Sequence, residues 1–298
     1  MQDIDRHFGY VTIVGRPNVG KSTLLNNIIG QKLSIISRKP QTTRARILGI
    51  KSTDNCQIVY IDTPGLQQKA GSMINRYMNR EATSSLAGVD VIVHMVEAGT
   101  WTELDEYVYT LVQKSGTPAI LALNKIDRVK NKKDILPCIK MVHEKGGYHD
   151  IVPISVRANK NIERLEECVR ALLPPGKAQY PDDQITDRDE RYFASEFIRE
   201  KLFHCLGDEL PYNLCVAIER FRDTDRLIEI DAVIWVERSG QKKIVIGSKG
   251  VVLKKVGAQA RMDMEKMFGK KVLLATWVRV KNNWTNDARA LRQMGYNC

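Results

Sequence analysis

One stretch of sequence decides the fold of the first half of the chain: Gly15-Arg16-Pro17-Asn18-Val19-Gly20-Lys21-Ser22. It follows an apolar run, Gly9–Val14, and precedes a helical pattern, Ser22–Leu33, so its glycines lie in a turn between a strand and a helix. The spacing GxxxxGK[ST] in that setting is typical of a phosphate-binding loop, whose backbone N–H groups approach phosphate oxygens closely. We expect Lys21 to reach the β- and γ-phosphates of a nucleotide and the Ser22 hydroxyl to bind Mg²⁺.

Short apolar runs and helical patterns alternate on both sides of this loop, as far as residue 173. We expect strands at Gly9–Val14, Ile47–Ile50, Gln57–Ile61, Val89–Val96, Ala119–Leu123 and Ile151–Ile154. We expect helices at Ser22–Leu33, Met73–Leu86, Glu103–Lys114, Lys132–Lys145 and Asn161–Leu173. Strands separated by crossover helices favour an α/β domain with a mostly parallel sheet covered on both faces.

A second motif, Asp62-Thr63-Pro64-Gly65, follows the expected strand at 57–61. An acid in this place can reach the metal ion through water, and a glycine N–H can meet the γ-phosphate. Leu66 comes next, where Ras-like proteins carry the glutamine that positions water, so another group must place the water molecule. We expect Asn18 to help hold a monovalent cation such as K⁺ near the phosphates, in place of an arginine finger.

The loop between these two motifs, residues 38–44, reads RKPQTTR and carries two threonines. A threonine in such a loop completes the Mg²⁺ shell while the γ-phosphate is present and leaves it afterwards. We favour Thr43 over Thr42, and a plain polar surface loop is the alternative. The expected catalytic residues are Lys21, Thr43, Asp62 and Gly65, and the expected metal ligands are Ser22, Thr43 and Asp62.

A third motif, Asn124-Lys125-Ile126-Asp127, ends the expected strand at 119–123. Asp127 can accept hydrogen bonds from the N1–H and the 2-amino group of guanine, a donor pair that adenine lacks, so GTP is favoured over ATP. Ser155-Val156 follows the strand at 151–154, where G proteins usually place Ser-Ala to contact the guanine oxygen. The expected nucleotide site comprises Gly15, Arg16, Pro17, Asn18, Val19, Gly20, Lys21, Ser22, Asp62, Thr63, Pro64, Gly65, Leu66, Asn124, Lys125, Ile126, Asp127, Ser155 and Val156.

Positive charge is concentrated near the other end of the chain. The 298 residues include 46 Lys and Arg against 35 Asp and Glu, a net charge of +11. Residues 237–281 contain 12 basic and 3 acidic side chains, a net of +9. A field that concentrated favours a polyanion as partner, either nucleic acid or an anionic membrane surface, and a solubilising surface is the alternative.

Composition restricts the class of protein. No apolar run approaches the roughly 18 to 20 residues of a membrane span. Residues 1–7 carry two acids and no apolar stretch, unlike a secretory signal. The six cysteines are far apart and form no CxxC pair, which fits reduced thiols in a cytosolic protein. The length indicates two domains.

The pattern changes after the sequence Pro174-Pro175-Gly176. We expect a nucleotide domain at 1–174, an exposed polar linker at 175–190 and a second domain at 191–298. In the second domain we expect a helix at 191–206, strands at 212–221 and 228–236, two short helices at 249–256 and 259–268, a strand at 272–281 and a last helical turn near 286–294. The order is α–β–β–α–α–β.

A GxxG turn, Gly247-Ser248-Lys249-Gly250, lies within the basic segment, where we expect it to join a strand to a helix. Such a turn lets a nucleic-acid backbone approach closely while an apolar groove beside it receives unpaired bases. A basic α/β module that binds nothing is the alternative. The expected RNA contacts are Lys242, Lys243, Gly247, Ser248, Lys249, Gly250, Lys254 and Lys255.

These motifs together resemble the Era family of ribosome-associated GTPases. The resemblance is carried by GRPNVGKS at 15–22, PQTTR at 40–44, DTPGL at 62–66, NKID at 124–127 and VIGSKG at 245–250. It implies a TrmE–Era-type GTPase domain followed by a type-II KH domain, across essentially the whole chain. It further implies binding to the 3′ end of small-subunit (16S) ribosomal RNA and a role in assembling that subunit. Without a glutamine or an arginine finger, we expect slow hydrolysis of GTP to GDP.

The resemblance also implies a cytoplasmic protein with some peripheral association with the inner membrane, and we expect a monomer in solution. Two other functions compete for the same features. One is an RNA-binding scaffold that holds GTP without hydrolysing it, which phosphate release would distinguish. The other is a membrane-surface GTPase whose basic part meets anionic lipid. The GxxG turn favours RNA, because it is suited to a nucleotide backbone.

Overall fold

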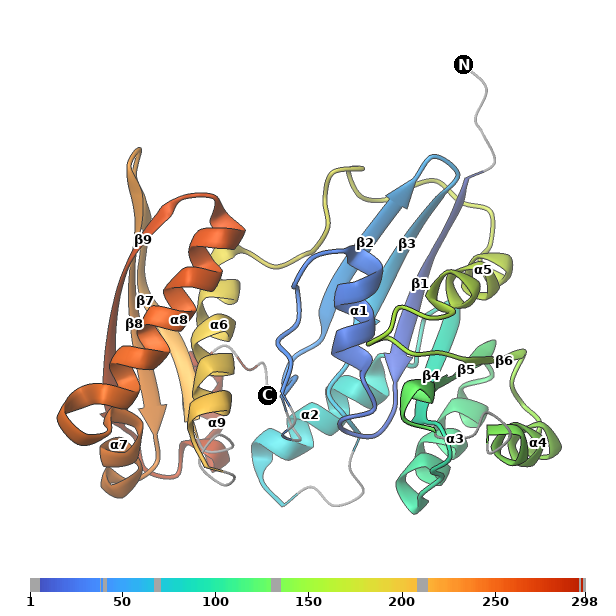
Figure 1. The fold of residues 1–298 in the computed structure, drawn as a ribbon, viewed down its shortest axis with the longest axis horizontal. Helices are drawn as coiled ribbons and strands as arrows, with labels where there is room; N and C mark the ends of the chain where they lie inside the picture. Colours follow the sequence, from blue (N-terminus) through green and yellow to red (C-terminus); the bar gives the residue numbers. More distant parts are fainter. Residues whose placement is uncertain are drawn as a thin grey trace. The chain divides into compact units, whose positions relative to one another are not determined.

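The computed structural model describes residues 6–37, 39, 42–66, 71–129, 135–207, 214–294 and 296 (Figure 1). The chain divides into two compact units. The first comprises Met1–Ser34, Thr43–Ala70 and Met78–Asp187. The second comprises Ile35–Thr42, Gly71–Tyr77 and Arg188–Cys298. Two short segments from the first half of the sequence are therefore grouped with the second unit.

The first unit is built on a six-stranded sheet. Its strands are β1 (His7–Val14), β2 (Ile47–Thr53), β3 (Cys56–Asp62), β4 (Val91–Glu97), β5 (Ala119–Asn124) and β6 (Asp150–Pro153). Their order is β2-β3-β1-β4-β5-β6, and every neighbouring pair is parallel except β2 with β3. Crossover helices connect the parallel strands, so the mostly parallel sheet predicted from the alternation is confirmed.

Both faces of this sheet are covered. Val11, Thr12, Ile13 and Val14 are consecutive residues of β1, and each is fully buried. Because successive side chains of a strand point to opposite faces, such a run has protein packed on both sides. The helices that follow the strands are α1 (Lys21–Ile29), α2 (Met73–Ser84), α3 (Glu103–Ser115), α4 (Ile135–Lys145) and α5 (Ile162–Leu172), with a 3₁₀ turn η1 (Ile126–Arg128).

The structure contains each predicted helix and strand of the first unit, but several of them begin or end at other residues than predicted. Helix α1 is predicted to reach Leu33, but it ends at Ile29 because Gly30 adopts φ 76° and donates its N–H to Asn26 O. The predicted first turn of α4, residues 132–134, lies outside the described residues.

Residues 175–187, predicted as an exposed linker, run along the sheet of the first unit. Ile50 donates its N–H to Ile185 O at 2.9 Å. The Gln57 side chain accepts hydrogen bonds from Gln179 N and Tyr180 N and donates one to Tyr180 O. The segment carries many exposed side chains, as a polar linker should, but its backbone is fixed by these hydrogen bonds.

The second unit contains a three-stranded sheet in the order β7-β8-β9. Strands β7 and β8 are antiparallel, whereas β8 and β9 are parallel. The elements are α6 (Glu190–Cys205), β7 (Leu214–Asp223), β8 (Leu227–Val236), α7 (Ser239–Ile246), η4 (Ser248–Gly250), α8 (Val251–Phe268), β9 (Lys271–Val280), η5 (Trp284–Asn286) and α9 (Ala288–Gln293). The order α–β–β–α–α–β is as predicted, but its two middle helices are not the predicted ones. Residues 249–256 and 259–268, predicted as two helices, belong to η4 and the single helix α8, and α7 is the other helix.

The predicted setting of the GxxG turn is wrong. The turn joins two helices, α7 and α8, and no strand enters it. The apolar run that ends at Ile246 suggested a strand, but Val245 is the only member of α7 that is buried, as on one side of a helix. Helix α8 continues through Gly257 without a break. Its buried residues Val256, Ala260 and Met264 recur at helical spacing and so lie on one face.

Candidate functional site

The phosphate-loop glycines are required by close packing. A Cβ on Gly15 would lie 2.4 Å from Met95 O, and one on Gly20 would lie 2.4 Å from Asn124 Nδ2. Both residues also have positive φ, 151° and 111°. Helix α1 begins directly afterwards at Lys21, so its N-terminal N–H groups are directed at the loop.

Lys21 is held inside the phosphate loop. Its side chain is buried, and Nζ donates to the carbonyl oxygens of Gly15 and Arg16, each at 3.0 Å. Burial lowers the pKa of Lys21 to about 8, although the nearby Asp62 carboxylate acts in the opposite direction. A phosphate bound in the loop would favour the charged ammonium.

Ser22, Thr43 and Asp62 form one polar corner. Ser22 Oγ donates to Asp62 Oδ2 at 2.7 Å and lies 2.8 Å from Thr43 Oγ1. Thr42 takes no part in this corner, because its hydroxyl donates to Lys39 O at 2.7 Å. Thr43, which the sequence favours as a metal ligand, is therefore the threonine that lies beside Ser22.

Asp62 is suited to a divalent cation. It is fully buried, and burial raises its pKa, although hydrogen bonds from Ser22 and Ser34 and the charge of Lys21 oppose that rise. Its Oδ1 has no hydrogen-bond partner within the described part of the chain. A buried carboxylate oxygen left unpaired is costly, and two hydroxyls lie beside it, so these residues fit Mg²⁺. No cluster of three His, Cys, Asp or Glu side chains that could hold a metal is found in the described residues.

The residues after Asp62 divide between the site and the core. A Cβ on Gly65 would lie 2.9 Å from Pro17 N, so Gly65 packs against the phosphate loop. Leu66, in contrast, packs in an apolar cluster with Val14 and Ile92 and is 1% exposed. Its side chain therefore belongs to the hydrophobic core, so the predicted nucleotide contact of Leu66 would have to come from its backbone, and that contact stays a prediction.

The loops predicted to select guanine are tied together by side-chain hydrogen bonds. Asn124 Nδ2 donates to Val19 O at 2.7 Å, and Asn124 Oδ1 accepts from Val156 N at 3.1 Å. The exposed Asp127 carboxylate accepts from Ser155 Oγ at 2.6 Å, and this hydrogen bond lowers the pKa of Asp127. The Val156 side chain is buried, so only its backbone faces the loop.

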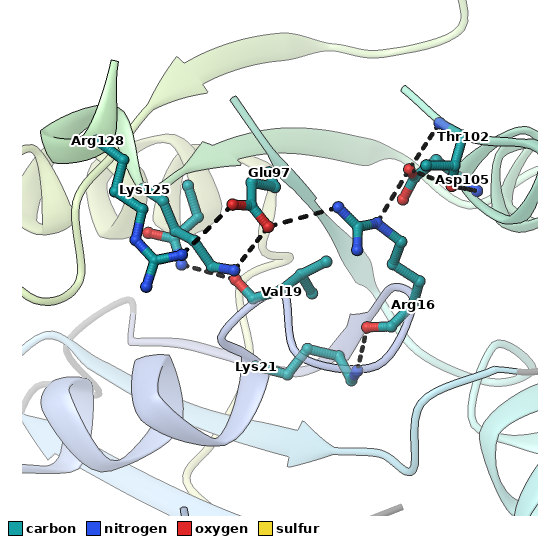
Figure 2. Close-up of polar contacts among 9 residues, drawn as sticks. Arg16, Val19, Lys21, Glu97, Thr102, Asp105, Lys125 and Arg128 are labelled. Atoms are coloured by element: carbon teal, nitrogen blue, oxygen red, sulfur yellow. Dashed lines mark hydrogen bonds and ion pairs between the residues drawn. The ribbon is translucent and has the colours of Figure 1, made fainter. Parts of the chain in front are cut away.

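Charged residues that the sequence prediction missed surround these loops (Figure 2). Glu97 lies beside Lys125 and Arg16, and Asp105 accepts a hydrogen bond from Arg16 Nε at 3.1 Å. One signal pointed to Glu97, since it is the first polar residue after the predicted strand at 89–96, at the edge of the sheet where ligands bind. Asp105 gave no such signal, because an acid in the first helical turn is common.

The GxxG turn of the second unit has a constrained backbone. Gly247 and Gly250 have φ values of 75° and 77°, and Lys249 between them has φ 50°. A Cβ on Gly247 would lie 2.5 Å from Val252 Cγ2, whereas the space around Gly250 is open. The predicted contact residues are brought together on α7, the turn and α8, with Lys243, Ser248, Lys249, Lys254 and Lys255 exposed and Lys242 half-buried.

Comparisons with known proteins agree with both halves of this description. A family model described as "50S ribosome-binding GTPase" matches residues 10–125, and one described as "KH domain" matches residues 209–285. The chain is 50% identical over 295 residues to GTPase Era of Vibrio cholerae serotype O1, covering 98% of this chain and 90% of the relative. The chain belongs to the Era family of GTPases.

Other Era proteins and structures support this assignment. Era of Ectopseudomonas mendocina is 51% identical over 288 residues, covering 97% of this chain and 96% of the relative. The structure of an Aquifex aeolicus Era variant bound to GDP and AlF4⁻ superimposes with a TM-score of 0.95 at 38% identity, covering 98% of this chain and all of that one. Era in complex with MgGDPNP and nucleotides 1506–1542 of 16S ribosomal RNA gives the same TM-score, identity and coverage.

Family membership confirms the predicted fold class and activity. The chain is a GTPase with a P-loop domain on a mostly parallel sheet, followed by a KH domain of the type-II order. The chain covers 96% and 99% of the length of two of its Era relatives. Within the residues that the structure describes, no helix is both long and apolar enough to cross a membrane.

Proposed function

We propose that this GTPase uses its nucleotide state to control binding of its KH domain to the 3′ end of 16S ribosomal RNA, and so assists assembly of the small subunit. The observation that carries the proposal is the likeness to the Era structure that contains nucleotides 1506–1542 of that RNA. The broad GTPase family model names the 50S particle, but the RNA in the related complex belongs to the small subunit.

The domain limits of the proposal are 1–174 for GTP binding, 175–190 for the connection and 191–298 for RNA binding. Asp127 selects guanine, and Lys21 with the phosphate-loop amides stabilises charge on the β- and γ-phosphates. Ser22, Thr43 and Asp62 hold Mg²⁺, which neutralises phosphate charge when bound. The polar corner and the paired loops described above support these roles.

Water must be positioned without a glutamine, because Leu66 stands where Ras-like proteins carry that residue and its side chain lies in the core. We propose that Asn18, exposed at φ 64° in the phosphate loop, helps to hold K⁺ near the phosphates. Steady-state phosphate release in Mg²⁺ and KCl should exceed that in NaCl severalfold, and equal rates in the two salts would remove the cation from the proposal.

The same assay separates an enzyme from a scaffold that only holds GTP. Lys21→Ala should lower phosphate release by about 100-fold or more, because the lysine ammonium that stabilises charge on the transferred phosphoryl group is lost. Without nucleotide, it should bind RNA as the unaltered protein does. Release by the unaltered protein no faster than by Lys21→Ala would favour the scaffold.

The RNA partner is tested by crosslinking the intact protein in cell extract and sequencing the bound RNA. Reads should gather at the 3′ end of 16S ribosomal RNA, and an even spread over ribosomal RNA would contradict the proposal. Flotation with vesicles of anionic lipid tests whether the basic part also mediates peripheral membrane association. A cytoplasmic, monomeric protein is the accompanying proposal, which light scattering and cell fractionation check.

A further inference from the structure

Glu97 occupies a position that the proposed roles leave unexplained. It is the last residue of β4, at the carboxyl end of the sheet where the nucleotide-binding loops begin. It is in register with Asn124, the last residue of β5. The pairing of two strands therefore fixes the Glu97 backbone beside the loop that starts with Lys125.

The Glu97 carboxylate joins the two nucleotide-binding loops. Its Oε2 accepts a hydrogen bond from Lys125 Nζ at 2.6 Å and lies 3.5 Å from Arg16 Nη2. Its Oε1 lies 3.6 Å from Nη1 of the exposed Arg128. Figure 2 shows the carboxylate between the side chains of Lys125 and Arg16. One charged group thus bridges the base-binding loop and the phosphate loop.

Arg16 transmits this contact to the catalytic lysine. Its Nε donates to the fully buried Asp105, whose carboxylate also closes the N-terminal cap of α3 with Thr102. The backbone oxygen of Arg16 accepts a hydrogen bond from Lys21 Nζ at 3.0 Å. Fixing the Arg16 side chain at two carboxylates therefore restricts a carbonyl group that orients Lys21.

These contacts are partly shielded from solvent. The side chains of Glu97, Lys125 and Arg16 are 25%, 18% and 19% exposed, so their charges are screened less than those of a surface pair. Burial by itself would raise the pKa of Glu97, but the hydrogen bond and charge of Lys125, with Arg16 and Arg128, lower it. Glu97 is therefore ionised when the protein binds nucleotide at neutral pH.

We propose that Glu97 is a positioning residue for guanine-nucleotide binding, which holds Lys125 and Arg16 in the bound arrangement before nucleotide arrives. It contacts none of the reacting atoms. Loops fixed in advance cost less ordering on binding and release the ligand more slowly than loops that move independently. The proposal rests on the assignment of the loops at 15–22 and 124–127 to the nucleotide site.

The test is the release of fluorescent mant-GDP and mant-GDPNP from Glu97→Gln in a stopped-flow instrument. Both nucleotides should dissociate about tenfold faster, because a partly buried charge pair is lost. Single-turnover cleavage of bound GTP should change less than release does, because Asp105 still holds the Arg16 side chain. Glu97→Asp keeps the charge and should restore part of the slow release.

Glu166→Gln is the matched control. Glu166 Oε1 accepts from Lys51 Nζ at 2.6 Å, the same distance as in the Glu97 pair, but it joins α5 to β2. Nucleotide release from this variant should not change. Release from Glu97→Gln no faster than from Glu166→Gln would overturn the proposal, and urea unfolding of both variants shows whether a difference is only a loss of stability.

A double variant tests the route. In a Lys125→Met background, Glu97→Gln should accelerate release much less than it does alone, because its main partner is already gone. Full additivity would show that Glu97 does not act through Lys125. Failure of the unaltered protein to bind mant-GDP would instead contradict the nucleotide site itself, which keeps the two proposals distinguishable.

Discussion

The nucleotide loops and the GxxG segment both face phosphate groups in our proposals, but they are built differently. In the first unit two of the decisive groups are buried and hydrogen-bonded to fixed neighbours: Lys21 is 6% exposed and Asp62 is fully buried. In the second unit the lysines around the turn are mostly exposed on two helices. Chemistry on one phosphate needs fixed geometry in a shielded site, whereas binding along a polyanion needs charge density and close backbone approach.

The two regions should therefore differ in their sensitivity to single substitutions. Removing one group from the nucleotide site leaves a buried partner unmatched, so single substitutions there should have large effects. Removing one exposed lysine loses a single screened contact among several. The backbone of the GxxG turn should be the sensitive part of the second unit, because its positive φ values are tolerated poorly by other residues.

The largest effect is expected from Asp127→Asn. An amide cannot accept from both the N1–H and the 2-amino group of guanine, so GTP affinity should fall about 100-fold or more. Xanthine carries an oxygen at the 2 position, which the new amide can donate to, so xanthosine triphosphate should become the better substrate. Competition of each nucleotide with mant-GDP measures the change.

Asp183→Asn, a change of the same kind at an exposed residue of the same unit, serves as the control. It should leave the preference for GTP intact. If Asp127→Asn kept that preference too, another residue would select the base. The nucleotide loops would then not depend on single, precisely placed groups more than the GxxG segment does.

The second effect concerns the turn. Gly247→Asp combined with Gly250→Asp should weaken RNA binding by about 100-fold while GTP affinity stays unchanged, because both carboxylates would face phosphates from a strained backbone. Fluorescence anisotropy with a single-stranded RNA from the 3′ end of 16S ribosomal RNA measures the loss.

Gly250→Asp alone separates position from strain. Gly269 has a similar φ, 68° against 77°, and open space around its Cβ position, so Gly269→Asp adds the same charge and a similar backbone penalty outside the turn. Gly250→Asp should weaken RNA binding much more than Gly269→Asp. Equal losses would mean that net charge, and not the turn, governs binding.

The third effect is a pH dependence confined to the nucleotide site. The pKa of Lys21 is lowered to about 8 by burial, so above that pH the nucleotide-free protein must take up a proton to present a charged lysine. Affinity for GDP should therefore fall as pH rises, by about tenfold between pH 7 and 9. Titration calorimetry in buffers of different ionisation enthalpy measures both the affinity and the proton uptake.

Lys21→Arg stays charged throughout this range, so its affinity should be nearly independent of pH even if it is lower. A flat profile for the unaltered protein would show that the buried lysine is already charged without nucleotide, and would weaken the argument from burial.

The smallest effect is expected from Lys249→Ala. Loss of one exposed phosphate contact should weaken RNA binding only two- to threefold at physiological salt and lower the slope of log Kd against log[KCl] by about one. A tenfold or greater loss would show that Lys249, at φ 50° within the turn, has a fixed role like those in the nucleotide site.

The sequence predicted that the three nucleotide motifs lie together, and it did so for a physical reason. Residues 15–22, 62–65 and 124–127 each follow a strand, and parallel strands bring their carboxyl ends to one edge of a sheet. Three motifs that each follow a parallel strand are therefore expected to lie close together. The same reasoning did not show that the Leu66 side chain is buried. A motif position does not reveal which way a side chain points, and packing against Val14 and Ile92 decided it.

Local sequence was less informative in the second unit. Residues 239–246 contain β-branched side chains that suggest a strand, but burial of Val245 within a helix overrides that propensity. The backbone pairing of residues 175–187 was also hidden, since a polar composition does not show which hydrogen bonds a segment makes.

By itself, the sequence determined the alternation of strands and helices, the three nucleotide motifs and the basic GxxG segment, because each depends on residues close together in the chain. Only the tertiary structure decided that Thr43 and not Thr42 meets Ser22, and that Glu97 joins Lys125 to Arg16. It also decided that one oxygen of Asp62 has no hydrogen-bond partner among the described residues. Those facts depend on side chains from distant elements reaching the same few ångströms. Spacing along a chain does not specify that arrangement, and strand register and burial do.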